Sequence, residues 1–250
     1  GTGDMPGRII FATTADGAQA ATERVRINAA GDTLIANGTG VVVGHTAQET
    51  ISIGDGATDL VPEFQVLGTA QADSSLMLAA FSATATAAGA PLLAMVKGGN
   101  ATIGSHTVVT NGEELGNIIA YGDDGTDLEA PAAMISFEVD GTPGTGDMPG
   151  RMIFATTTDG GEALAERMRI NAAGAAFIGD TANAGVTAGS LTINQGANDD
   201  EALALKSSDA GHPLTNSAEA DTFGKFTKAS GGNGGLLIWG ISDSGSDSCD

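Results

Sequence analysis

"GTGDMPGRIIFATTADG" at residues 1–17 returns at residues 144–160 as "GTGDMPGRMIFATTTDG". With a constant offset of 143 and no gaps, residues 1–35 and 144–178 are identical at 25 of 35 positions. Most replacements keep the character of the side chain, such as Ile9 to Met152. One structural unit is therefore used twice in this chain.

Each copy predicts a β-hairpin followed by a third short strand. Residues 8–14 are dense in strand-forming side chains, and the Ala-Asp-Gly sequence that follows is a turn signal. Residues 23–28 alternate, which predicts Arg24 and Arg26 on one face and the apolar side chains between them on the other. We expect residues 8–35 and 151–178 to share their backbone and their arginine placement.

Six of the ten basic residues fall in the two copies. They are Arg8, Arg24, Arg26, Arg151, Arg167 and Arg169. Because the chain also holds 31 acidic residues, we expect arginine–carboxylate pairs, within the unit or across a boundary between chains. The alternative interpretation is a solvated strand face.

The rest of the chain reads as short strands separated by glycine-rich turns. The expected strands are residues 41–43, 51–53, 63–67, 76–81, 92–96, 107–110, 117–121, 133–139, 190–193, 201–206 and 236–241. The alanine-rich stretch 79–90 has helical propensity, but its Thr, Gly and Pro residues favour strand–loop–strand.

Four segments are predicted from this pattern. They are the end of a first module (1–35), a β-rich body (36–143), the second hairpin copy (144–179) and a C-terminal β module with a frayed acidic tail (180–250). The second copy follows a lead-in at 139–143 that the first copy lacks, and there is no initiator Met. We therefore expect residue 1 to lie inside a longer protein.

Composition predicts an all-β protein with a thin core. The 250 residues include 38 Gly, only 4% are aromatic, and 16% are charged. We expect an elongated, repeat-containing fibre of short strands, intertwined or stacked between chains. The net charge of −21 argues against nucleic-acid binding, and the absence of any run of 18 apolar residues argues against a membrane-spanning helix.

Several stretches resemble a known protein family. They are FQVLGTAQADSSLML (64–78), ELGNIIAYGDDGTD (114–127), AAMISFEVDGTP (132–143), GTGDMPGRMIFATTTDG (144–160) and AERMRINAAG (165–174). Together they are similar to a module of bacteriophage tail-fibre and other virion-fibre proteins. The resemblance covers about residues 60–179, takes 1–35 as the end of an earlier module, and is looser over 180–250.

This resemblance implies a β-rich, usually trimeric fibre in a virion or outside the cell. Its partners would be two further copies of the chain, other virion proteins and a cell-surface glycan receptor. The motifs mark architecture and carry no catalytic signature, so we expect no enzyme activity.

Candidate chemical sites are few. His45, His106 and His212 are far apart in sequence, and neighbouring acidic residues such as Glu113 and Glu114 would face opposite ways on a strand. Calcium is the one cofactor considered. Asp123, Asp124 and Asp127 offer three carboxylates around a Gly, with Asp55 and Asp59 as a weaker version. An ordinary solvated turn is the alternative.

The sequence thus predicts a structural component of a viral tail or head fibre that provides length and spacing, with host-surface attachment as a further role. The alternatives are a carbohydrate-active enzyme or lectin-like module on the same scaffold, and a bacterial surface filament or adhesin. A groove with converging carboxylates or exposed aromatics would favour the carbohydrate alternative.

Overall fold

The computed structural model describes residues 6–35, 40–52, 59–83, 89–185, 188–198 and 200–242. Within these ranges the regular structure is almost entirely β-strand, apart from one 3-10 turn, η1 (Gln71–Asp73). The predicted all-β fold is confirmed at this level. The chain divides into two compact units, Gly1–Ala94 with Tyr121–Pro131, and Met95–Ala120 with Ala132–Asp250.

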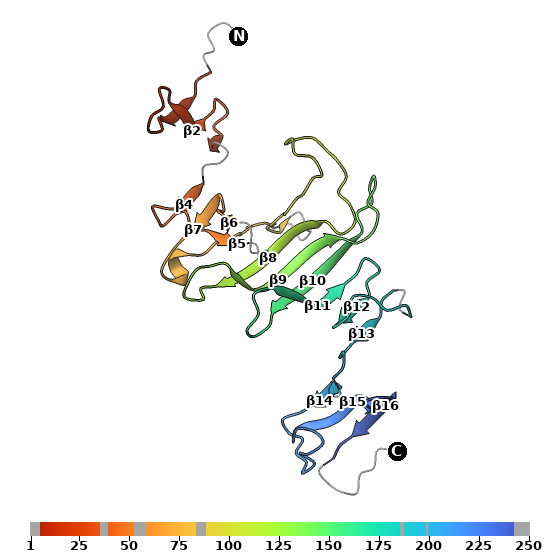
Figure 1. The fold of residues 1–250 in the computed structure, drawn as a ribbon. Coiled ribbons are helices and arrows are strands. Elements are labelled where there is room, and N and C mark those ends of the chain that lie inside the picture. Colours follow the sequence, from red (N-terminus) through yellow and green to blue (C-terminus); the bar gives the residue numbers. More distant parts are fainter. Residues whose placement is uncertain are drawn as a thin grey trace. The chain divides into compact units, whose positions relative to one another are not determined.

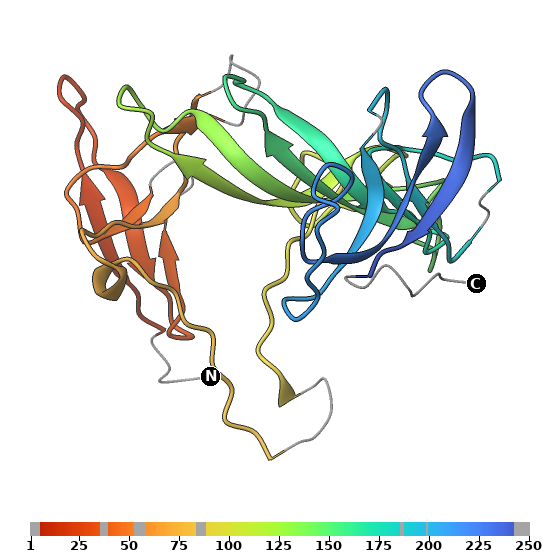
Figure 2. The ribbon, with the colours of Figure 1, turned by 90° about the horizontal axis from the view of Figure 1, so that it is seen from below.

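The first hairpin copy forms a three-stranded sheet, drawn in red in Figure 2. Its strands are β1 (Ile9–Thr13), β2 (Thr22–Ile27) and β3 (Thr33–Ile35), in that order and antiparallel. Among the described residues, β1 is hydrogen-bonded to β2 alone and is one edge of this sheet.

The second copy lies inside a six-stranded sheet, labelled in Figure 1. Its strands are β8 (Glu114–Gly122), β9 (Ala130–Val139), β10 (Gly150–Thr157), β11 (Leu164–Ile170), β12 (Ala176–Ile178) and β13 (Leu191–Ile193). They follow one another across the sheet, and only β12 and β13 are parallel among the pairs whose register is resolved. The sheet therefore draws on three of the four segments expected from the sequence.

The two hairpins have the same strand pairing, as predicted. Ile9 lies opposite Ile27 as Met152 lies opposite Ile170, and the register shifts after Phe11 as it does after Phe154. The turn into the third strand is also repeated. The side chain of Asn28 accepts the backbone N–H groups of residues 30 and 32, and that of Asn171 accepts those of residues 173 and 175.

A separate three-stranded sheet ends the described chain. It consists of β14 (Glu201–Lys206), β15 (Thr222–Ser230) and β16 (Gly234–Gly240), with β15 in the centre (Figure 1). The sequence indicated β14 and β16 but not β15, whose sequence TFGKFTKAS contains two lysines and a glycine.

Two parallel strand pairs each end at a glycine. They are β4 (Val41–Val43) with β7 (Phe64–Val66), and β12 with β13, whereas the pair β5 (Ile51–Ser52) and β6 (Asp59–Leu60) is antiparallel. Gly44 and Gly179 follow β4 and β12 with φ of 90° and 70°. A Cβ there would lie 2.1 Å from the Leu67 carbonyl oxygen or 2.2 Å from the Asn194 carbonyl oxygen, so no other residue fits.

Three expected strands are not formed. Residues 76–81, 92–96 and 107–110 have no regular structure, so the prediction of strand–loop–strand around the alanine-rich stretch is wrong in its described parts. These residues have strand-forming side chains, but within the described ranges no neighbouring strand completes a hydrogen-bond ladder with them. Phe81 and Val96 are 99% and 91% exposed as a result.

Little of the apolar surface is enclosed by the chain itself. Eight apolar residues are buried in the described ranges, against thirty-two large apolar residues that are exposed. The buried ones are Val109, Val139, Ile153, Ala155, Ala175, Phe177, Ala218 and Ile241. No helix among the described residues has the length and apolar character needed to cross a lipid bilayer.

Candidate functional site

A β-bulge in each hairpin brings a glutamate and an arginine together. Side chains three residues apart face opposite ways on a regular strand, but the register shift leaves Arg24 and Arg167 without a partner across the ladder and reverses the alternation. Glu23 and Arg26 therefore share a face and pair at 2.5 and 2.6 Å, and Glu166 and Arg169 pair at 2.5 Å through both oxygens. The hydrogen bonds that Arg169 donates to the Glu166 carboxylate raise the pKa of Arg169.

The bulge arginines themselves face the other way. Arg24 Nε donates to Thr13 Oγ1 at 3.0 Å, and Arg167 Nε donates to Thr156 Oγ1 at 2.9 Å. The prediction that Arg24 shares a face with Arg26 is wrong, because the extra residue flips the strand between them. In the described part of the chain neither Arg24 nor Arg167 pairs with a carboxylate.

Arg151 ties the second hairpin to the strand before it. Its guanidinium contacts Glu138 Oε2 at 2.5 and 2.8 Å and Asp140 Oδ1 at 3.1 Å, and all three side chains are at least three-quarters buried. The other oxygen of Asp140 accepts the backbone N–H of Ala172 at 2.8 Å. Asp140 thus joins the end of β9 to both the start of β10 and the turn after β11.

We expect Arg151→Gln to lower the opening free energy of the six-stranded sheet by about 2–3 kcal/mol, because two shielded carboxylates lose their cation. Native-state hydrogen exchange of the β9 and β10 amides measures this quantity. Arg8→Gln is the matched control, because Arg8 makes no ion pair among the described residues and is exposed. If Arg8→Gln and Arg151→Gln changed the opening free energy equally, the stabilising role given to the Arg151 ion pairs would be contradicted.

The two faces of the six-stranded sheet differ in polarity and in burial. Residues opposite one another across a ladder share a face. One face carries the ion pairs of Arg151 and Arg169 together with the buried side chains Ser136, Ile153, Ala155 and Phe177. The long arginine side chains lie beside these residues and help to shield them.

The opposite face, here called the open face, is apolar and only partly covered by the described chain. It is formed by Ile135, Phe137, Met152, Phe154, Met168, Ile170, Ile178, Leu191 and Ile193. None of these nine residues is buried, and Leu191 is 61% exposed. An apolar sheet face of this size is a surface for packing against another polypeptide.

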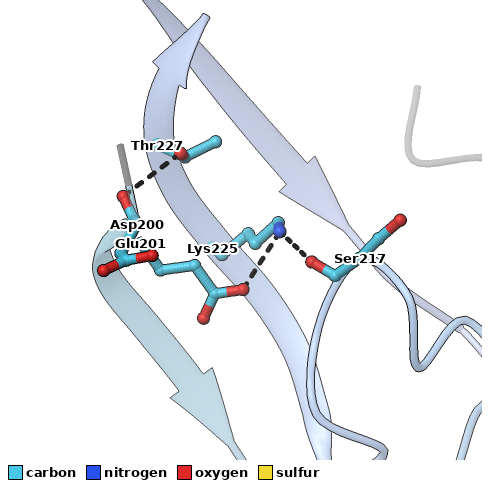
Figure 3. A pocket seen from close by; sticks show the side chains of 5 residues that line it. All are labelled: Asp200, Glu201, Ser217, Lys225 and Thr227. Carbon is cyan, nitrogen blue, oxygen red and sulfur yellow. Dashed lines mark hydrogen bonds and ion pairs between the residues drawn. The ribbon is translucent and has the colours of Figure 1, made fainter. Parts of the chain in front are cut away.

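A second polar cluster lies in the C-terminal sheet and was not indicated by the sequence. Lys225, on the central strand β15, is only 7% exposed, and its ammonium donates to Glu201 Oε1 at 3.0 Å and to the Ser217 carbonyl oxygen (Figure 3). The same nitrogen lies 5.1 Å from the centre of the Trp239 ring. A hollow of about 420 Å³ beside it is lined by Asp200, Glu201 and Thr227. The hydrogen bonds of the lysine are satisfied by its own sheet and by the loop between β14 and β15, which indicates a structural role.

The structure does not gather the aspartates proposed for calcium. Asp123 and Asp124 accept the N–H groups of Gly125 and Thr126 at 2.8 Å, and Asp127 accepts that of residue 129 at 3.0 Å. The N–H groups of Thr126 and Asp127 lower the pKa of Asp124, and the bonds together shape a tight turn. Among the described residues no three acidic, histidine or cysteine side chains are grouped to hold a metal ion, and Asp55 lies outside those residues.

No histidine belongs to a group of three metal-ligating side chains among the described residues. His45 and His106 are exposed, whereas His212 is 6% exposed and its Nδ1 accepts the Leu214 N–H at 3.2 Å. Its Nε2 has no partner within the described ranges.

No family model matches this chain, and no curated protein matches it.

Proposed function

We propose that this chain is a structural component of a viral tail or head fibre, in which copies of the chain pack through their apolar sheet faces. The observation that carries the proposal is the repeated hairpin module, whose second copy presents an open face that the described chain leaves partly exposed. A module of this kind is completed by neighbouring modules or chains.

Further copies of the same chain are the partner that best fits this surface. Exposed apolar side chains occur in both hairpins, in residues 76–81 and 92–96 and in β16, so the partner must offer apolar surface to several parts of the chain. A copy of the chain repeats the same spacing, and closed symmetry then lets every copy cover its neighbour. The resemblance of residues 60–179 to virion-fibre modules supports three copies and a location in a virion.

The proposed work is mechanical. The modules supply length and spacing, other virion proteins and a cell-surface glycan are the proposed external partners, and no catalytic step is assigned. Calcium at Asp123, Asp124 and Asp127 is not needed for this role.

Sedimentation equilibrium tests the proposal directly. We expect a species with three times the chain mass of 24.6 kDa at micromolar concentration. A stably folded monomer would contradict it, because such a monomer would have to tolerate thirty-two exposed large apolar residues in its described part alone.

A further inference from the structure

The two hairpin copies differ at the outer edge of their first strand. In the second copy β9 pairs with β10, so that Phe137 lies opposite Met152 and Glu138 lies opposite Arg151. In the first copy the corresponding edge of β1 has no neighbour among the described residues. The same hairpin is therefore seen once with this strand in place and once without it.

The polar groups that hold β9 are present in the first copy. Arg8 corresponds to Arg151, and the backbone N–H of Ala29 corresponds to that of Ala172. In the described part of the chain Arg8 makes no ion pair, and no acceptor is found for the Ala29 N–H. The two donors whose equivalents bind the carboxylates of Glu138 and Asp140 in the second hairpin therefore have no such partner in the described part of the first.

A hollow lies where that strand would end. Its volume is about 770 Å³, and its lining includes Pro6, Arg8, Ile9, Ile27 and Ala29. In the second copy the counterparts of Pro6, Arg8 and Ala29 contact Asp140 at the end of β9: Asp140 donates its N–H to the Pro149 carbonyl oxygen, and its carboxylate accepts from Arg151 and from the Ala172 N–H. The hollow therefore matches the place of the Glu138–Asp140 segment in the second hairpin.

Apolar side chains along the edge fit the same occupant. Ile9 and Phe11 are 56% and 58% exposed. Their counterparts Met152 and Phe154 lie opposite Phe137 and Ile135 of β9 and are half-buried. A strand carrying apolar residues at these positions would cover both.

We propose that the β1 edge and the hollow beside Arg8 bind an extended polypeptide segment of the same kind as β9. The segment adds as an antiparallel strand, places Ile and Phe side chains opposite Phe11 and Ile9, and directs a Glu and an Asp two residues apart at Arg8 and Ala29. Main-chain hydrogen bonds supply affinity, and the two carboxylates set the register. This inference does not depend on the fibre proposal, since it rests only on the comparison of the two hairpins.

The test uses a fluorescent peptide with the sequence of residues 132–143, AAMISFEVDGTP, added to the full chain. We expect saturable binding by anisotropy, weakened by salt, and new hydrogen-exchange protection of amides in β1. A peptide with Gln and Asn at its two acidic positions should bind about tenfold more weakly or worse. Arg8→Gln in the chain should have the same effect, whereas Thr158→Lys, on an exposed turn, should have none.

Three outcomes would overturn the proposal. One is the absence of binding at millimolar peptide, and another is equal binding of the acidic and amide peptides. The third is protection of β1 that already rises with chain concentration without peptide, since a second copy would then occupy the edge. Because the amide peptide tests the charges without altering the chain, misfolding of the Arg8 variant cannot mask the result.

Discussion

Replacing Ile153 with Ala is expected to destabilise the six-stranded sheet by about 3 kcal/mol, whereas Ile10→Ala should cost about 1 kcal/mol or less. The two residues occupy the same position in the two hairpins and have the same side chain. Ile153 is 6% exposed between the arginine pairs, and Ile10 is 40% exposed. The difference follows because only the buried methyl groups leave a cavity when they are removed.

Hydrogen exchange is measured on each variant separately, and each measurement reports on both hairpins because both are in the same chain. The amides of β10 and β11 should lose protection in the first variant, and those of β1 and β2 should change little in the second. If Ile10→Ala proved as costly as Ile153→Ala, the first hairpin would be covered in solution to the same degree as the second. Ile10 would then be buried by another part of the assembly, although it is exposed in the single chain.

Charges placed on the open face are expected to abolish self-association. In the double variant Ile170→Lys and Ile193→Lys, two side chains that are each 38% exposed become cations on an apolar surface. The lysines can still reach solvent in the separate chain, but packing against another copy would bury them without partners. We expect the sedimenting mass to fall from three chains to one.

The strand content of this variant should persist, because the opposite face with Ile153 and Phe177 is unchanged. Circular dichroism separates loss of assembly from loss of folding. Thr158→Lys on the exposed turn controls for the added charge. An oligomer that survives the double substitution would place the interface elsewhere and contradict the proposed role of the open face.

The hairpins could be predicted from sequence because their signals are local. The strand-forming residues and the turn residues between them are properties of a few neighbours, and both copies form the two strands and the turn, although the bulge breaks the alternation at Arg24 and Arg167. The bulge was missed, since one extra residue changes neither composition nor propensity. In retrospect Glu23 and Arg26, three residues apart and repeated as Glu166 and Arg169, were its signal.

Features that depend on distant neighbours could not be predicted in the same way. The polar strand β15 can occupy the centre of its sheet because the charge of Lys225 is neutralised by Glu201 and its ammonium lies over the Trp239 ring, and both partners come from other strands. Residues 76–81 have the side chains of a strand, but the described chain offers no ladder beside them. The roles of Glu138 and Asp140 likewise emerged only when β9 was seen next to β10.

The identical register of the two hairpins creates a competition during folding. β1 could pair with β11, or β10 with β2, and every ladder contact including the bulge would still match. The loop from Thr13 to Thr22 is short, whereas the crossed pairing must close about 150 residues. Before either hairpin has formed, this difference in loop-closure entropy favours the correct pairing over the crossed pairing by about 2.5 kcal/mol. Once β9 pairs with β10, the ion pairs of Glu138 and Asp140 with Arg151 hold β10 in place, and β10 can no longer pair with β2. The first hairpin has no such lock in the described chain, so it is the copy more open to strand exchange between molecules.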